Sequence, residues 1–136
     1  MTEITPKTRL EGQRGHVIHT RPWAVLVEFY RELISKGWAF VPMLRLVEVI
    51  ATSPAAAQLH GATSHSDLLL SDCADFRSGD STLHIVYEPS DRTFLFRHRS
   101  FSTHDYQKTC TEADALQTLR LFLRLKYGVL LDTPAA

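Results

Sequence analysis

The sequence has little of the material from which redox, zinc and nucleotide sites are built. Only two of its 136 residues are cysteines, and Cys73 and Cys110 lie far outside the CxxC spacing of redox motifs and zinc sites. The six glycines form neither a GxGxxG fingerprint nor a Walker loop. We therefore expect no redox centre, no bound zinc and no nucleotide cofactor.

Long apolar runs are absent as well. No stretch reaches the roughly 20 apolar residues that cross a bilayer. Residues 1–7 carry no apolar segment typical of a signal peptide. Together with the low cysteine content, these features predict a cytoplasmic protein with free thiols and no membrane partner.

A net charge is also lacking, since 15 basic residues balance 15 acidic ones. The two signs are unevenly placed: residues 51–91 hold six acids and one base, whereas residues 92–127 hold seven bases and three acids. This asymmetry is compatible with pairing between the two halves of one domain, and equally with a basic surface patch.

What is present is ordinary globular material, with 44% hydrophobic and 22% charged residues. A chain of this length buries roughly two-thirds of its unfolded surface. We expect one domain over residues 1–136, with a loose arm at 1–19 and a frayed tail at 130–136.

The most regular stretch predicts a β-hairpin over residues 82–99. Two segments rich in β-branched and aromatic residues flank a Glu-Pro-Ser-Asp turn. A two-residue loop at Ser90 and Asp91 segregates the faces, whereas a slip of one residue would mix them. The predicted core face consists of Leu83, Ile85, Tyr87, Phe94, Phe96 and His98.

The opposite face of this hairpin is predicted to carry an apolar pair inside a charged rim. Its candidate binding residues are Val86 and Leu95 at the centre, with His84, Glu88, Arg97 and Arg99 around them. Such an arrangement is typical of a protein interface. Two interpretations stay open: this face binds another protein, or an N-terminal helix covers it to make a third layer.

The C-terminal segment predicts a helix over residues 112–127. Thr111 and Asp114 have the spacing of a capping box, and Gly128 stands at the C-terminal cap. Leu121 and Leu125 widen its apolar stripe, which indicates burial against more than one neighbour.

The N-terminal half predicts a helical cluster. A first helix begins near Pro22 and ends at Gly37. A second helix over residues 42–52 leaves only Arg45 and Glu48 as a polar stripe, so it is either almost fully buried or covered by a second copy in a homodimer.

The remaining segments predict a short third helix over 55–60 ended by Gly61, a strand over 66–71 and a weakly alternating edge strand over 101–107. The predicted fold class is α+β. An N-terminal helical cluster accompanies a small antiparallel sheet of three or four strands centred on residues 82–99, and the C-terminal helix packs on one sheet face.

The sequence contains seven histidines, so we considered a metal site, but their positions predict none. His16 and His19 precede the first helix, and His84 and His98 belong to opposite hairpin faces. Residues 64–67 contain hydrolase residue types, but sequence neighbours do not converge as a triad. We predict no catalytic residue, and a metal-dependent, cysteine or serine hydrolase is the least favoured function.

These patterns favour a non-enzymatic protein-binding module of the adaptor, chaperone or inhibitor type. The alternative is a single-stranded nucleic-acid-binding protein that uses the basic and aromatic residues of segment 92–126. Nucleic acid is less favoured because Phe94 and Phe96 are more simply core residues and because the overall charge is neutral.

Overall fold

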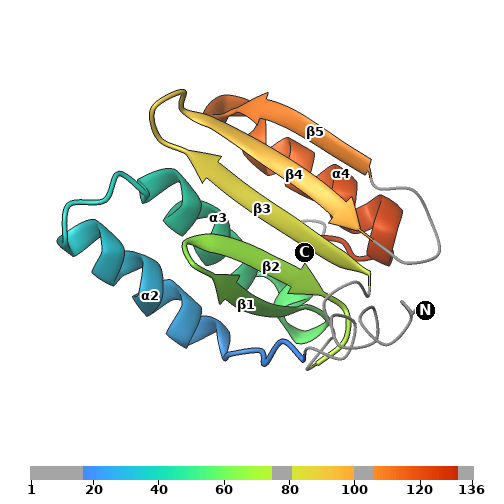
Figure 1. The fold of residues 1–136 in the computed structure, drawn as a ribbon. Coiled ribbons are helices and arrows are strands. Elements are labelled where there is room, and N and C mark those ends of the chain that lie inside the picture. Colours follow the sequence, from blue (N-terminus) through green and yellow to red (C-terminus); the bar gives the residue numbers. More distant parts are fainter. Residues whose placement is uncertain (1–16, 75–80, 100–105, 132–136) are drawn as a thin grey trace, which may run out of the picture.

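The computed structural model describes residues 17–74, 81–99 and 106–131, which contain helices followed by strands and then a last helix (Figure 1). The helices are α2 (Trp23–Ser35), α3 (Val41–Ala51), the 3-10 helices η1 (Pro54–Ala57) and η2 (Glu112–Asp114), and α4 (Ala115–Tyr127). The strands are β1 (His60–Ser64), β2 (Asp67–Ser71), β3 (Thr82–Glu88), β4 (Thr93–Arg99) and β5 (Tyr106–Thr111). The predicted α+β class is confirmed.

The strands form one antiparallel sheet in which each strand pairs with the next along the chain, in the order β1-β2-β3-β4-β5. Its five strands exceed the three or four that were predicted. The edge strand expected over 101–107 corresponds to β5, which begins only at Tyr106. Residues 101–105 of that prediction lie outside the described residues, as do 1–16 of the expected arm and 132–136 of the expected tail.

The strand that the sequence did not predict is β1. The third helix was expected to continue to residue 60 and stop at Gly61, but η1 ends at Ala57 and Gly61 lies inside β1. A Cβ atom at this position would lie 2.8 Å from Cδ1 of Leu26 and 3.0 Å from Cη2 of Trp23. Gly61 therefore lies where Trp23 and Leu26 of α2 pack directly on β1, and the glycine serves packing instead of ending a helix.

The register of β3 and β4 confirms the predicted division of the hairpin into two faces. Leu83 pairs with His98, Ile85 with Phe96, and Tyr87 with Phe94. All six of these side chains are buried. The loop contains residues 89–92 instead of two residues, but it adds one residue to each side, so the pairing stays the same.

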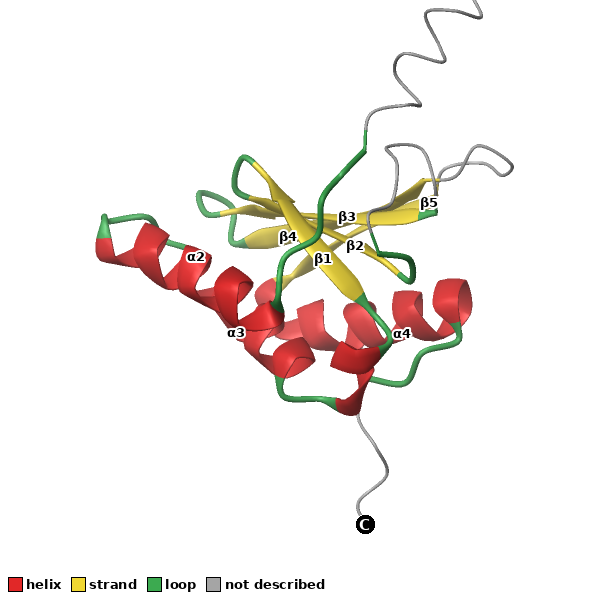
Figure 2. Cartoon of the chain, turned by 90° about the horizontal axis from the view of Figure 1, so that it is seen from below, coloured by secondary structure: helices red, strands yellow, loops and turns green. Residues whose placement is uncertain are grey.

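The helices form a single layer on this buried face. Figure 2 shows α2, α3 and α4 on the same side of the sheet, so the molecule has two layers in the described part of the chain. The core between the layers joins Tyr30 of α2, Met43 of α3 and Phe122 of α4 to the sheet side chains Ile85 and Phe96. The three-layer alternative is therefore wrong for these helices.

The prediction for helix α4 is correct at its C-terminal end and wrong at its N-terminal end. Gly128 has a φ of 65°, and its N–H donates to the Arg124 carbonyl oxygen at 3.1 Å, so the predicted C-terminal cap is confirmed. The Thr111 hydroxyl makes no capping hydrogen bond, and η2 precedes α4. The predicted capping box is therefore wrong, because the chain enters the helix through a tighter 3-10 turn.

Helix α3 uses only part of its surface for the core. Met43, Leu46, Val47 and Ile50 are buried, whereas Val41 is exposed. The homodimer expected through residues 42–52 stays a prediction. None of the helices in the described ranges is both long and apolar enough to cross a membrane.

Candidate functional site

The open face of the sheet carries all six residues that the sequence singled out for binding. In β3 and β4, His84 lies opposite Arg97 and Val86 opposite Leu95, while Glu88 and Arg99 lie at the two ends of the hairpin. Their side chains alternate with the buried set along each strand, so they point away from the helices on the other side of the sheet. We call this surface the open sheet face.

The centre of the open sheet face is a directly opposed apolar pair. Val86 and Leu95 are each partly buried and belong to β3, the middle strand of the sheet, and to its neighbour β4. Thr109 of β5 lies opposite Leu95, and Thr93 precedes Leu95 on the same face of β4 at the alternating spacing. The apolar area is therefore small and bordered by hydroxyl groups.

The polar rim is held in place by neighbours from strands on either side. His84 Nε2 lies 2.9 Å from Asp67 Oδ2 of β2, and both side chains are 27% exposed. Arg97 Nε donates to Oε1 of Gln107 of β5 at 3.2 Å. Arg97 is the cross-strand partner of His84, so Asp67 places a carboxylate beside this pair of residues.

Asp67 and Gln107 are site residues that sequence reasoning missed. Both lie outside the hairpin, and their contact with it depends on β2 and β5 being its neighbours in the sheet. The alternation of strand 66–71 was the available signal, since it places Asp67 and Leu69 on one face. Leu69 lies opposite His84 on this face, but its side chain is buried, so the open sheet face does not continue as an exposed surface through Leu69.

A groove of about 710 Å³ lies on the other side of the sheet, between α3 and α4. Its apolar lining includes Leu46 and Val49 of α3, Leu116 of α4 and the ring of Phe94. The ionisable groups that line it are Arg31, Arg45, Glu48 and Glu112, which sum to zero charge. Because the positive and negative groups balance, the groove gives little charge selectivity.

A hydrogen-bonded network joins the hairpin to the start of α4 beside this groove. The Tyr87 hydroxyl donates to Oε2 of Glu112 at 2.5 Å, and Arg92 Nε donates to the same oxygen at 3.2 Å. The Tyr87 hydrogen bond, followed by that of Arg92, lowers the pKa of Glu112. Burial, followed by the Glu112 hydrogen bond, raises the pKa of Tyr87 to about 12. A carboxylate with a lowered pKa is a weak proton acceptor, so this network is better suited to stabilising the fold than to acid-base catalysis.

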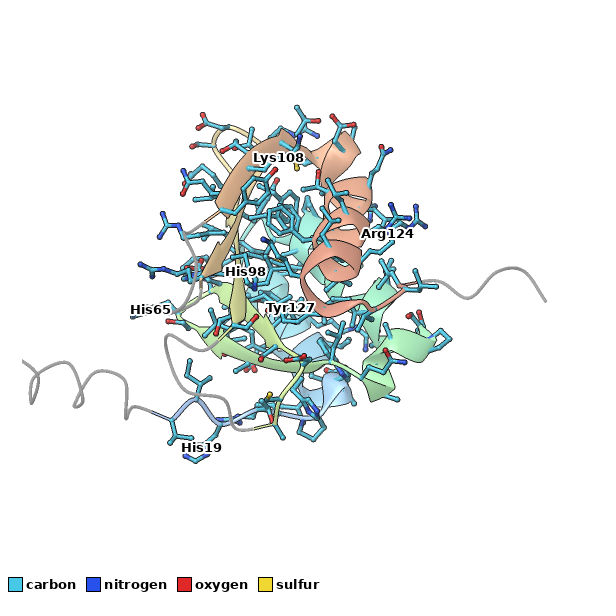
Figure 3. The ribbon with its side chains drawn as sticks, turned by 90° about the vertical axis from the view of Figure 1, so that its right-hand side faces the viewer. His19, His65, His98, Lys108, Arg124 and Tyr127 are labelled. Carbon is cyan, nitrogen blue, oxygen red and sulfur yellow. The ribbon has the colours of Figure 1, made fainter. Side chains whose placement is uncertain are left out.

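A buried polar cluster lies at the opposite end of the sheet. Ser81 Oγ lies 2.8 Å from His98 Nε2, and the Tyr127 hydroxyl donates to the Ser81 carbonyl oxygen at 3.1 Å. His98 and Tyr127 lie close together between the sheet and α4, with ring centroids 5.6 Å apart (Figure 3). Burial raises the pKa of the Tyr127 phenol above its usual range.

The contact between Ser81 and His98 was not predicted, and it brings together two residue types used in nucleophilic catalysis. His98 is only 5% exposed, so the imidazole is enclosed by β4 and α4 instead of facing a cleft. We interpret the cluster as a structural clamp that fixes the end of α4 on the sheet.

Metal-ligating side chains do not converge within residues 17–74, 81–99 and 106–131, where no three His, Cys, Asp or Glu side chains form a cluster. His84 and His98 point to opposite faces, as predicted. His16 lies outside the described residues. Cys73 and Cys110 are free thiols, the first exposed and the second buried.

Comparisons with known proteins assign the chain to no family. No protein-family model matches the chain, and no curated protein or solved structure is significantly similar to it.

Proposed function

We propose that the chain is a non-enzymatic protein-binding module that docks a partner on the open sheet face. The observation that supports this proposal is that α2, α3 and α4 pack on one side of the sheet and leave Val86 and Leu95 uncovered inside a charged rim. A small apolar centre with a polar border is common to protein interfaces.

The dimensions of this face favour a small and reversible interface. Strands lie about 4.8 Å apart and advance about 3.3 Å per residue, so the five strands and the seven residues of β3 span roughly 19 Å by 23 Å. Such a footprint belongs to the transient class of complexes instead of the large obligate class. The rim residues Glu88, Arg97 and Arg99 would then orient the partner and set its association rate.

The test is recovery of a partner on the immobilised chain from native lysate. Leu95→Asp places a carboxylate at the centre of the face, and leaving this charge unpaired in an interface costs more than the roughly 1–3 kcal/mol of an unpaired neutral polar group. We expect one dominant protein whose recovery falls at least tenfold. Val41→Asp is the matched control, because Val41 is an exposed aliphatic residue on the helical side.

Thermal unfolding of both variants checks that the fold is retained. Equal recovery on the wild type and Leu95→Asp, with both folded, would show that this face is not the binding surface. An equal loss of partner recovery with Val41→Asp would likewise contradict the location of the binding surface on the open sheet face.

The nucleic-acid alternative has weaker support. Phe94 and Phe96 are buried, so neither ring is available to stack on a base. Tyr106 is the aromatic residue of segment 92–126 that stays exposed in the described ranges, and Lys126 Nζ lies 5.3 Å from its ring centroid. Binding of a single-stranded oligonucleotide that weakens steeply with salt, with a flatter slope in Arg97→Ala/Arg99→Ala, would favour this alternative instead.

A further inference from the structure

The outward side of α4 exposes apolar side chains that the fold does not cover. Leu121 is 38% exposed and Leu125 is 62% exposed, although the sequence predicted burial of this wide stripe against more than one neighbour. Within the described residues the sheet side of α4 supplies one neighbour, through Leu119, Phe122 and Leu123. The outward neighbour is therefore missing from the chain as described.

The segment after α4 adds a third exposed leucine to the same side. Leu130 is 58% exposed, whereas Val129 and Leu131 on either side of it are buried. The Val129 N–H donates to the Leu123 carbonyl oxygen at 3.1 Å, and the Ser53 hydroxyl donates to the Leu131 carbonyl oxygen. These bonds hold Leu130 in a fixed position. We call Leu121, Leu125, Leu130, Arg120 and Arg124 the leucine-arginine surface.

This surface is cationic as well as apolar. Helix α4 contains Arg120, Arg124 and Lys126 and no acidic residue. Figure 3 shows Arg124 on the side of α4 that faces away from the sheet. Arg124 makes no ion pair within the part of the chain that the structure describes. Within the described residues, therefore, Leu121, Leu125 and Leu130 are exposed and Arg124 has no ion-pair partner.

Depressions flank the leucine ridge on both sides. One, of about 320 Å³, is lined by Gln117, Arg120, Leu121, Arg124, Leu130 and Leu131. The other, of about 560 Å³, reaches from Leu121 to Lys108 and Thr109 of β5, and Asp114 also lines it. Hollows of this size accept single apolar side chains of a partner, and Arg124, which lines the first depression, lies where it can pair with an acidic group.

We propose that the leucine-arginine surface binds an acidic protein segment whose leucine or aromatic side chains enter these depressions and whose carboxylates pair with Arg124. A second copy of the chain fits less well, because two such surfaces would bring like charges together. A bilayer also fits less well, since membrane-binding helices present a continuous apolar face, whereas this surface is hollowed and carries no exposed tryptophan or phenylalanine on α4.

This surface is separate from the open sheet face, because α4 packs on the opposite side of the sheet. The inference is therefore independent of the proposed function. A module with both surfaces active would bridge two partners.

The test uses a fluorescein-labelled peptide with three repeats of Glu-Glu-Leu-Leu and measures fluorescence anisotropy against the full chain. We expect saturable binding that weakens at least tenfold in Leu125→Asp and in Arg124→Glu. Val41→Asp/Arg45→Glu makes the same chemical changes on exposed positions of α3 and should leave the affinity unchanged. Leu95→Asp should also leave it unchanged, which separates this site from the open sheet face.

Peptide controls test the chemistry of the partner. A peptide with Lys in place of Glu, and one with Ser in place of Leu, should each bind at least tenfold more weakly than the acidic leucine peptide. Circular dichroism shows whether the variants are folded, and Leu125→Ser replaces Leu125→Asp if the latter is not.

The proposal is overturned by any of three outcomes. The first is unchanged peptide affinity in folded Leu125→Ser and Arg124→Glu. The second is that the chain binds phosphatidylserine vesicles but not the peptide, and that these variants abolish the vesicle binding. This outcome would identify a membrane surface. The third is a dimer in sedimentation that dissociates in Leu125→Asp, which would identify a second copy as the occupant.

Discussion

Replacing Gly61 by alanine tests the packing of α2 on the sheet. The new methyl group would lie 2.8 Å from Leu26 Cδ1 and 3.0 Å from Trp23 Cη2, whereas carbon atoms pack best at about 3.5–4.0 Å. The Trp23 ring has little freedom to move, because its Nε1–H donates to the carbonyl oxygens of Ala56 at 3.2 Å and Leu59 at 3.3 Å. Leu26 is buried, so its end is also confined.

Two opposing effects decide the size of the change. Overpacking of a filled core costs typically about 1–3 kcal/mol. Alanine stabilises a strand by up to about 1 kcal/mol relative to glycine, because glycine loses more backbone freedom on folding. We therefore expect Gly61→Ala to lower the free energy of unfolding by about 1–2 kcal/mol.

Urea unfolding at 25 °C, followed by tryptophan fluorescence, measures this change. Repeating the substitution in a Leu26→Ala background supplies the control, since the smaller side chain removes the closest of these contacts and leaves those with Trp23. The cost of Gly61→Ala should then become smaller, giving a coupling of about 0.5 kcal/mol or more between the two sites. An equal cost in both backgrounds, or stabilisation by Gly61→Ala alone, would refute the proposed packing contact.

Three further changes have defined outcomes. Gly128→Ala should lower the free energy of unfolding in urea by about 1–2 kcal/mol, because φ at this position is 65°. No atom lies near the new Cβ, so no clash adds to this cost, and Gly128→Asn should lower the free energy of unfolding by less. Because the pKa of Glu112 is lowered in the folded state, its stabilisation is present above its unfolded pKa and is lost as the pH falls through the folded value. Glu112→Gln should therefore destabilise the chain near pH 7 but not at pH 2, and a constant difference in unfolding midpoint would contradict this. If the chain dimerises through α3, Leu44→Asp, at a partly buried position of that helix, should shift sedimentation of the folded chain toward the monomer, and an unchanged dimer would exclude this helix.

The hairpin could be predicted because its pattern is local. Apolar and polar residues alternate through β3 and β4, and a wrong register would have exposed Phe96 or Ile85. The same alternation identified all six residues of the open sheet face. The neighbours Asp67 and Gln107 could not be found in this way, since their position depends on the order of strands in the sheet.

Strand β1 was missed because its sequence, His-Gly-Ala-Thr-Ser, has no alternating apolar signal. Its place in the sheet follows from pairing with β2 and from close packing of Trp23 and Leu26 over Gly61. The apolar stripe of α4 was misjudged for a related reason. A stripe shows which side chains would gain from burial, but Leu121 and Leu125 remain exposed because the described chain offers them no second neighbour.

The meander order of the strands has a kinetic consequence. Each strand pairs with its sequence neighbour, and the longest connection between paired strands covers residues 72–81, so hydrogen bonding can spread across the sheet one short loop at a time. The entropy lost on closing a loop grows with its length, and low contact order speeds folding. We expect the sheet to assemble faster than a Greek-key sheet of equal size, with the docking of α2 and α3 on the sheet as the late, long-range step, because it joins Tyr30 to Ser66 and Phe40 to Tyr87.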